Sequence, residues 1–264
     1  MKFYVSADME GISGIMLPDQ LLRGAPLFEE ARHLLTMEVN AVTEALVEAG
    51  ATQIIVKDAH SSGFNFIPEL LHSAADYVMG ATRVEQRFPG LDSSFDGAFL
   101  IGYHAMNGAR EAVRDHTMTS QGWQSIQLNG RMIGEIGLDA LIFGLYGVPV
   151  CLVSGDDKTC AEAVDELGDI AVYATKTATG RHSAIIKPPS RSRSELKDAV
   201  KKAVQNTAFC KPYSLSGPYE LIIRFLHTEQ ADARRYDNVN AQRMDGLTAV
   251  YRSDDLIDLL AAAF

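Results

Sequence analysis

Short apolar segments alternate with helical segments along most of the chain, and this alternation restricts the fold more than any other feature of the sequence. Lys2–Ala7 is rich in β-branched and aromatic residues and runs into a glycine-containing loop, which is typical of a buried strand. Leu27–Ala49 then carries apolar residues at helical spacing and stops before Gly50, a common C-terminal capping residue. Strands separated by helices pair in parallel. The pattern therefore predicts an α/β fold with a mainly parallel sheet flanked by helices.

The same alternation continues through the middle of the chain. Further strands are expected at Gln53–Val56, Ala98–Ile101, Val148–Val153 and Ile170–Ala174, with helices at Leu138–Tyr146, Lys158–Leu167 and Glu195–Gln205. Between Ser125–Leu128 and Met132–Ile133 stands Asn129-Gly130, the dipeptide that most strongly predicts a hairpin.

The last part of the chain has a different pattern. After the turn-rich stretch Lys211–Pro218, two strands are expected at Tyr219–Leu226 and Leu247–Tyr251, each followed by a short helix. We therefore expect an α/β body at residues 1–210 and a smaller C-terminal α+β part at residues 211–264, which can still pack as one unit.

Composition and charge narrow the classes of function. The 264 residues are 47% hydrophobic and 22% charged, close to ordinary globular usage. A net charge of -10 argues against nucleic acid as a partner, because nonspecific binding depends on Lys and Arg side chains that neutralise phosphates. No stretch approaches the roughly 18–20 apolar residues that span a bilayer, and acids appear too early for a signal peptide. We expect a cytoplasmic protein that does not contact a membrane.

Several motifs that define common sites are absent. The cysteines Cys151, Cys160 and Cys210 include no C-x-x-C pair, which argues against a disulfide framework and against a thiolate zinc site. Gly11-x-x-Gly14 matches neither dinucleotide-binding nor P-loop spacing, and acids precede it where a pyrophosphate needs open amides. No G-x-S-x-G elbow is present, so the chain offers no serine-hydrolase nucleophile.

Ionisable side chains gather where the predicted strands end. Asp8 and Glu10 follow the first strand, Asp58 and His60 follow the second, and His104 follows the third. Residues two apart in an extended segment point the same way, and ligands bind outside the carboxyl ends of parallel strands. Taken singly, such an acid is more often a helix cap and such a histidine more often structural. Their coincidence at matching strand ends favours a shared site.

The residue types in this cluster are those of a metal centre. Two carboxylates and two imidazoles without cysteine suit zinc, manganese or cobalt, and a carboxylate can also bridge two ions. Glu135, in Gly134-Glu135-Ile136-Gly137, is the natural fifth ligand, and His116 stands in a loop without an obvious packing partner. Asp58 is expected to orient a ligand histidine rather than bind metal itself.

Weaker candidates lie elsewhere. Arg181 is equally compatible with contact to an anionic substrate group and with a solvated loop. Asp157 is expected to cap a helix. His33, His72 and His227 are expected to be structural.

Four motifs together carry a resemblance to a known family. Ser6-Ala7-Asp8-Met9-Glu10-Gly11-Ile12-Ser13-Gly14, Asp58-Ala59-His60-Ser61, Gly102-Tyr103-His104-Ala105 and Gly134-Glu135-Ile136-Gly137-Leu138 resemble the signatures of D-aminopeptidases of the DppA type, metallopeptidase family M55. The resemblance covers Met1 to about Ser183, with the motifs in order, and the segment around Asp8 is its most specific part.

The resemblance implies a role for each residue. Asp8 would bridge two zinc ions per subunit, with Glu10 and His104 holding one ion and His60 and Glu135 the other. His116 falls at the family's catalytic histidine. Here its neighbours are Asp115 and Thr117 rather than serines, and Asp115 could orient His116 or raise its pKa. The family also implies a homo-oligomer, specifically a decamer that encloses a chamber.

The function expected from the residues and the resemblance is a dinuclear-zinc aminopeptidase. It would hydrolyse the N-terminal bond of short D-amino-acid peptides such as D-Ala-D-Ala, using metal-activated water assisted by His116. Two alternatives stay open. One is a metal-dependent amidase that acts on a different amide or an L-peptide. The other is a non-catalytic metal-binding protein of the same fold.

Overall fold

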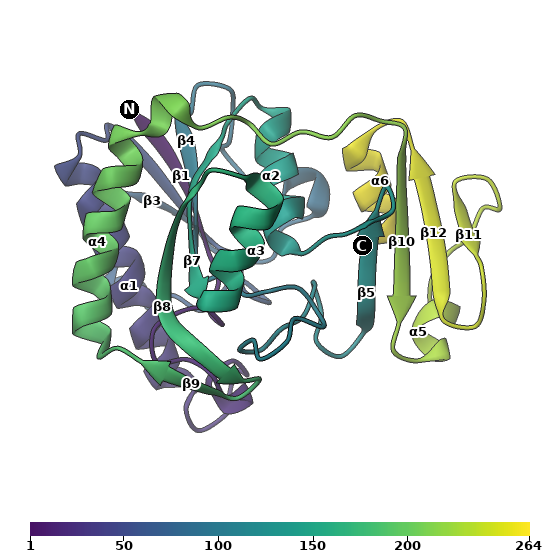
Figure 1. Ribbon diagram of the computed structural model, residues 1–264, viewed down its shortest axis with the longest axis horizontal. Helices are drawn as coiled ribbons and strands as arrows, with labels where there is room; N and C mark the ends of the chain where they lie inside the picture. Colours follow the sequence, from purple (N-terminus) through teal and green to yellow (C-terminus); the bar gives the residue numbers. More distant parts are fainter.

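The computed structural model describes residues 1–264 and contains a seven-stranded and a five-stranded sheet, which lie side by side along the long axis of the molecule (Figure 1). In spatial order, the strands of the large sheet are β3 (Asp76–Val78), β2 (Gln53–Asp58), β1 (Lys2–Ala7), β4 (Gly97–Ile101), β7 (Val150–Asp156), β8 (Ala171–Gly180) and β9 (Ser183–Ile186). Every neighbouring pair is parallel except β8 with β9. The mainly parallel α/β fold predicted from the sequence is therefore confirmed.

Helices cover both faces of the large sheet. One face packs against α1 (Phe28–Glu48) and α4 (Pro189–Gln205), and the other against α2 (Glu135–Leu145) and α3 (Asp157–Leu167). Successive residues of β1 alternate between these layers, as the pleat of a strand requires. Phe3 belongs to the core below α1 and α4, whereas Tyr4 packs edge-on against Phe143 of α2, with ring centroids 5.6 Å apart.

The five-stranded sheet is antiparallel and has the order β11 (Ala241–Arg243), β12 (Thr248–Ser253), β10 (Tyr219–Phe225), β5 (Trp123–Leu128) and β6 (Arg131–Met132). The hairpin predicted at Asn129-Gly130 is the turn between β5 and β6. β10 pairs with β5, so the C-terminal strands share their sheet with a segment from the middle of the chain. The division at residues 210 and 211 stays a prediction.

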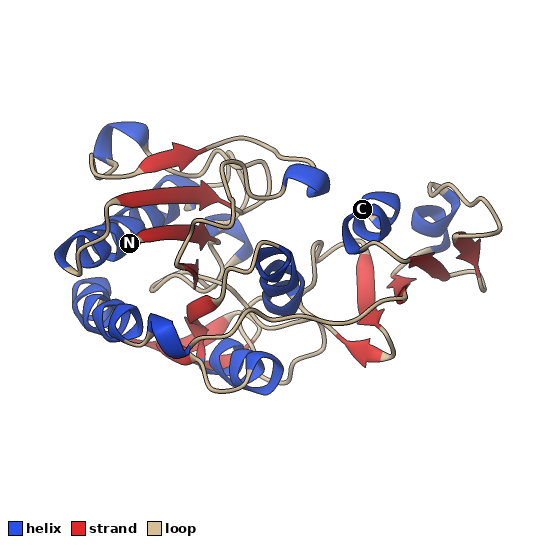
Figure 2. Cartoon of the chain, turned by 90° about the horizontal axis from the view of Figure 1, so that it is seen from above, coloured by secondary structure: helices blue, strands red, loops and turns tan.

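Two short helices complete the C-terminal region, α5 (Thr228–Asp232) and α6 (Leu256–Ala263). Four further segments are 3-10 helices: η1 (Pro18–Gln20), η2 (Pro68–Leu70), η3 (Val84–Gln86) and η4 (Thr207–Phe209). Viewed from above, helices and strands of the two regions are joined by loops that cross between them (Figure 2). Apolar side chains of α2 and of the small sheet belong to one continuous core, so the two regions pack against each other.

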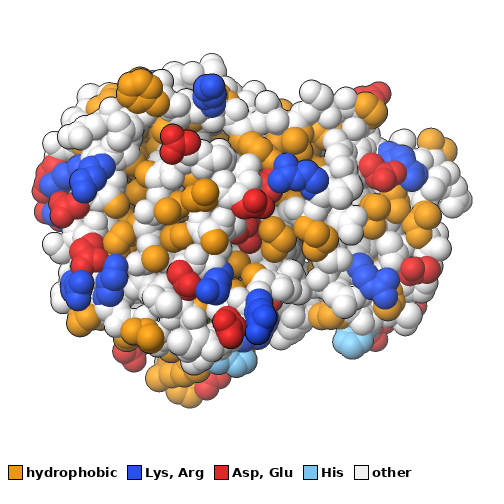
Figure 3. Space-filling model, viewed as in Figure 1, with side chains coloured by type: hydrophobic (Ala, Val, Ile, Leu, Met, Phe, Trp, Pro, Cys, Tyr) orange, Lys and Arg blue, Asp and Glu red, His pale blue; other side chains and the backbone are white.

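Two further features of the molecule are the distribution of charge on its surface and the length and polarity of its helices. On the face drawn in Figure 3, acidic and basic side chains are interspersed and no large basic patch appears. No helix in the chain is both long enough and apolar enough to cross a membrane.

Candidate metal centre

The loop after β1 places Asp8 and Glu10 against the end of β4. The backbone N–H of Asp8 donates to the Ile101 carbonyl at 2.8 Å, and that of Gly11 donates to Gly102 at 2.8 Å. A side chain at Gly11 would put its Cβ 2.0 Å from the Tyr103 carbonyl oxygen, far inside van der Waals contact. Only glycine allows this approach, which brings both acids beside His104.

A buried lysine that the sequence analysis missed holds the same loop through hydrogen bonds to its carbonyls. Lys176 on β8 is 1% exposed, and its ammonium donates to the carbonyls of Glu10 at 2.6 Å, Ile12 at 2.9 Å and Ile15. The hydroxyl of Thr175 adds a bond of 2.6 Å to the Gly11 carbonyl. The only signal in the sequence is a charged residue in a strand-like run, and β8 extends past the predicted end at Ala174.

The loop after β2 carries His60, and Asp58 stabilises this loop through Asn65. The Asp58 carboxylate accepts from the Asn65 backbone N–H at 2.5 Å and from the Asn65 amide at 2.8 Å. The same amide also donates to the His60 carbonyl at 2.7 Å. Asp58 therefore positions the backbone around His60 through Asn65. Its effect on the histidine is indirect, because Asn65 and Phe66 occupy its oxygens and none of them bonds the ring.

His104, His116 and Glu135 complete the cluster. His104 Nε2 lies 3.3 Å from Glu135 Oε1 and 3.4 Å from Asp8 Oδ2. The rings of His104 and His116 stack with centroids 3.9 Å apart and an interplanar angle of 13°. On the opposite side, His60 Nε2 lies 3.4 Å from Glu10 Oε1. Since the potential ligand atoms of Glu10, Asp8 and His104 lie within 4.8 Å of one another, all six predicted site residues gather in one place.

The local hydrogen bonds fix which nitrogen of two rings faces the cluster. A carbonyl oxygen only accepts, so the Nδ1–H of His104 donates to Ala105 at 3.0 Å and that of His116 donates to Arg114 at 2.9 Å. In the neutral rings, each Nε2 then keeps its lone pair and points toward the carboxylates. This is the tautomer that a metal-binding imidazole needs, with its second nitrogen held by a backbone carbonyl.

Three buried polar atoms of the cluster have no hydrogen-bond partner. They are Glu10 Oε2, His60 Nδ1 and His104 Nε2. Buried polar atoms are nearly always paired, so three exceptions among neighbouring side chains require an explanation. Their electron-pair donors fit a cation of the zinc type, because carboxylate oxygen and imidazole nitrogen are its usual ligands outside thiolate sites. The potential ligand atoms of Asp8, Glu10 and His104 all lie within 4.8 Å of one another.

The close packing of opposite charges shifts the pKa values of the cluster. Burial opposes ionisation of Glu135, but the imidazole of His104 outweighs it and lowers the pKa of Glu135 to about 2. Burial likewise disfavours a charged His60, yet the Glu10 carboxylate raises the pKa of His60 to about 9. Burial and the neighbouring Glu10 raise the pKa of Asp8 well above its usual range. In this crowded site the carboxylates need positive charge nearby.

The loop that carries His116 is anchored to the hairpin between β8 and β9. Arg181, at the hairpin tip, pairs with the Asp115 carboxylate and also donates to the Asp115 carbonyl. The other Asp115 oxygen accepts from Gly108 N–H at 2.8 Å. Asp115 therefore acts on the loop and not on the ring. Burial and the adjacent His104 lower the pKa of His116, so the expectation that Asp115 raises it is wrong.

A second layer of buried groups supports the cluster from behind. Tyr103 donates to Asp139 on α2 at 2.5 Å and also bonds Ser6 at 2.8 Å. Arg87 pairs with both oxygens of Asp139. Because Asp139 lies one helical turn after Glu135 and Tyr103 precedes His104, this network fixes two site residues through their own chain segments.

Other predicted residues lie outside the cluster. Asp157 is the first residue of α3, and its neighbour Asp156 is the N-cap, which accepts from Thr159 N–H at 2.7 Å. Arg181 forms a salt bridge with Asp115, so its partner in this structure is another side chain of the same protein. His72 Nδ1 accepts from the backbone of Ala74 at 3.2 Å, as a structural histidine does.

The family model for peptidase family M55, described as D-aminopeptidase, matches residues 1–263. The D-aminopeptidase of Bacillus subtilis (strain 168) is 34% identical over 234 residues, covering 88% of this chain and 84% of that protein. A solved structure described as the Zn-dependent D-aminopeptidase DppA from Bacillus subtilis, a self-compartmentalizing protease, superposes with a TM-score of 0.93. That likeness has 31% sequence identity and covers 100% of this chain and 95% of the other. The chain belongs to peptidase family M55, the metal-dependent D-aminopeptidases.

Proposed function

We propose that this protein is a zinc aminopeptidase that releases the N-terminal residue of short D-amino-acid peptides such as D-Ala-D-Ala. One observation carries the proposal: five potential metal ligands and His116 converge at the carboxyl edge of the sheet, and three of their buried polar atoms lack a hydrogen-bond partner. The similarity to a zinc-dependent D-aminopeptidase supports the choice of metal and of substrate class.

We assign two zinc ions per subunit to the cluster, with manganese or cobalt as possible substitutes. Asp8 would bridge the ions, Glu10 and His104 would complete one site, and His60 and Glu135 the other. The close grouping of Asp8, Glu10 and His104 supports the first site. His60 contacts Glu10 rather than Glu135 here, so the second pairing is the finer part of the proposal. When bound, such ions polarise the scissile carbonyl and lower the pKa of water toward neutrality.

His116 is the proton-handling group in this proposal. Its Nδ1–H is committed to the Arg114 carbonyl, so the Nε2 lone pair is the one available to substrate and water. The lowered pKa of His116 keeps the ring neutral at pH 7, as required for accepting a proton and returning it to the leaving amine. Stacking on His104 holds the ring plane in place.

The substrate is proposed to bind through its free amine. The cluster is rich in carboxylates and the chain has a net charge of -10, both of which favour a cationic amino terminus. Limitation to D-residues depends on the shape of the pocket around the amine. Paired D- and L-dipeptides of the same composition measure that selectivity directly.

We further propose a cytoplasmic homo-oligomer, specifically a decamer. The similar DppA is described as self-compartmentalizing, which supports assembly of several copies around an internal space. Light scattering on the purified protein, combined with cell fractionation, tests both parts. A stable monomer or a membrane-pelleting protein would contradict them.

The decisive experiment measures metal content and hydrolysis together. We expect about two ions per chain, hydrolysis of D-Ala-D-Ala that is lost on chelation, and recovery on adding zinc. If the protein binds two ions but hydrolyses L-Ala-L-Ala or another amide instead, the proposed D-peptide substrate is wrong and the metal centre stands. Metal without turnover on any peptide would leave a metal-binding protein, and neither metal nor activity would contradict the centre itself.

A further inference from the structure

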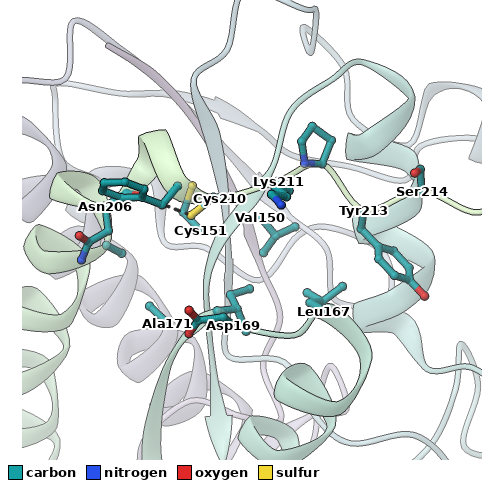
Figure 4. Close-up of a pocket in the computed structure, with 14 residues that line it drawn as sticks. Val150, Cys151, Leu167, Asp169, Ala171, Asn206, Cys210, Lys211, Tyr213 and Ser214 are labelled. Atoms are coloured by element: carbon teal, nitrogen blue, oxygen red, sulfur yellow. Dashed lines mark hydrogen bonds between the residues drawn. The ribbon is translucent and has the colours of Figure 1, made fainter.

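A cavity of about 880 Å³ lies at the end of the large sheet opposite the metal centre. It is formed by the starts of β7 and β8, the last turn of α4, and the segment that leads toward the small sheet. Figure 4 shows two cysteines on its wall, Cys151 from β7 and Cys210 from the segment after η4. The proposed peptidase reaction uses neither of them.

The two sulfurs face each other. The side chains of Cys151 and Cys210 lie against each other, and their sulfurs are drawn next to each other in Figure 4. Cys210 also packs on the core cluster that contains Cys151 and its neighbour Leu152. Each sulfur makes a further contact of 3.7 Å to a carbonyl, of Pro149 for Cys151 and of Asn206 for Cys210. The two side chains are 59 residues apart in sequence, so the fold itself pairs them.

The members of the pair differ in exposure and reactivity. Cys151 is completely buried, whereas Cys210 is partly exposed at the cavity wall. The neighbouring Cys151 side chain lowers the pKa of Cys210 to about 7, although burial acts against this shift. Cys210 therefore has the accessible thiolate that reacts with oxidants, and Cys151 is the buried thiol beside it.

We propose that Cys151 and Cys210 are a reversible oxidation site that closes to a disulfide in the presence of a peroxide. The Cys210 thiolate attacks one peroxide oxygen, the O–O bond breaks, and a sulfenic acid and one water result. The Cys151 sulfur then attacks the sulfenic sulfur, its proton leaves with the hydroxyl group as a second water, and the S–S bond forms. In sum, two thiols and one hydrogen peroxide give one disulfide and two waters, and a dithiol reverses the reaction.

The disulfide would join the start of β7 to the segment that leaves the α/β body. Residues 211–218 connect η4 to β10, so the bond would fix the point where this connection departs from the large sheet. It would close a long loop, which restricts the unfolded chain and raises Tm by roughly 5 °C in a protein of this size. The inference is independent of the proposed function because it concerns only thiols.

The test uses the full-length assembled protein and hydrogen peroxide. After treatment, free thiols are alkylated in denaturant and the protein is digested without reduction for mass spectrometry. We expect two of the three thiols to disappear, a cross-linked peptide containing Cys151 and Cys210, and full reversal by dithiothreitol. Loss of no thiol, a Cys210 bond between two subunits, or oxidation centred on Cys160 would each overturn the proposal.

Variants separate the two roles and provide the control. Cys160 is buried on α3 and burial raises its pKa to about 12, so C160A should form the same disulfide. In C151S the Cys210 sulfenic acid has no partner and should accumulate, trapped by dimedone. C210S, at a partly exposed position, should fold and show neither dimedone labelling nor thiol loss. Labelling of Cys151 in C210S would reverse the assigned order and contradict the proposal.

Discussion

At the carboxyl ends of its strands, the large sheet buries a cluster of carboxylates and imidazoles, whereas at the amino ends it opens into a cavity with a mainly apolar lining. Both ends are made by the same parallel strands. They differ in the loops: hydrogen bonds from Lys176, Asn65 and Tyr103 hold the carboxyl-end loops, whereas more than half of the residues that line the amino-end cavity are hydrophobic.

This difference indicates that the groups proposed to bind metal and the groups that stabilise the fold by packing lie at opposite ends of the large sheet. Buried charges without partners destabilise a fold unless a ligand compensates them, so we expect the carboxyl end to depend on bound cations. The amino end has no such cluster of buried charges, and we expect packing to matter more there. Substitutions of equal size at the two ends should therefore have effects of different kind.

The largest effect is expected from replacing a proposed metal ligand by its amide. Glu135→Gln removes a negative charge and one donor oxygen, and should lower kcat/KM for D-Ala-D-Ala by at least about 10³-fold together with bound metal. Glu162 on α3 is a matched control, since it is a partly buried acid near the cluster and accepts from Met106 N–H at 2.6 Å. Glu162→Gln keeps that acceptor and should retain metal. Equal loss in both variants would show that any buried acid here matters only for folding.

His116→Ala should reduce kcat by about 10²- to 10⁴-fold, the range expected for removing a general acid–base group. Metal content should remain close to two ions per chain, because the proposed ligands are untouched. His33→Ala on the outer helix α1 serves as the control and should leave kcat unchanged. If His116→Ala kept near-wild-type kcat, the proton-handling role would be wrong.

Two glycines allow a direct comparison of the ends in stability. A Cβ at Gly11 would lie 2.0 Å from the Tyr103 carbonyl oxygen and 2.7 Å from Gly155 Cα, so backbone would have to move. At the amino end, a Cβ at Gly97 would meet the Cys151 sulfur at 2.4 Å, and this side chain can rotate. In urea unfolding of the metal-free protein, we expect a loss of more than about 4 kcal/mol for Gly11→Ala and about 1–3 kcal/mol for Gly97→Ala. Equal losses would remove the distinction between the two ends.

Lys176→Met should lower the free energy of unfolding by about 3–4 kcal/mol, because three buried carbonyls lose their donor. It should also raise the metal concentration needed for half-maximal activity, since the released loop carries Glu10. Lys57 on β2 is the control: it is 4% exposed and lies over the Phe88 ring at 5.2 Å. Lys57→Met exchanges that cation–π contact for an apolar one and should change stability much less. Unaltered metal affinity in Lys176→Met would show that the loop does not need this anchor.

Much of the fold and of the candidate site could be predicted from the sequence, and the parts that could not be predicted share one cause. The strands and the acids and histidines at their ends follow from local periodicity, and α1 was placed within one residue at each end. Local patterns do not determine the partners of Asp58 and Asp115, because Asn65 and Arg181 come to them through tertiary structure. The pairing of β5 with β10 joins residues about 100 apart and could not be found from periodicity.

The smallest expected effect is a change in the pH dependence of stability, and it concerns Glu38 on α1. This side chain is 1% exposed and accepts at 3.1 Å from the N–H of Ser13, a residue of the loop that follows Glu10. Burial raises the pKa of Glu38 from 4.5 to about 7, despite that bond and the nearby Lys176. The folded state therefore holds a proton that the unfolded chain releases between these pH values, and stability falls as pH rises from 4.5 through 7. The full loss corresponds to at most about 3 kcal/mol. In metal-free protein, Glu38→Gln should gain this amount relative to wild type between pH 4.5 and 8, because glutamine keeps an acceptor for Ser13 without titrating. A constant difference between the two proteins across this pH range would show that Glu38 is ionised in the folded state throughout, and that the carboxyl end tolerates this charge without a bound cation.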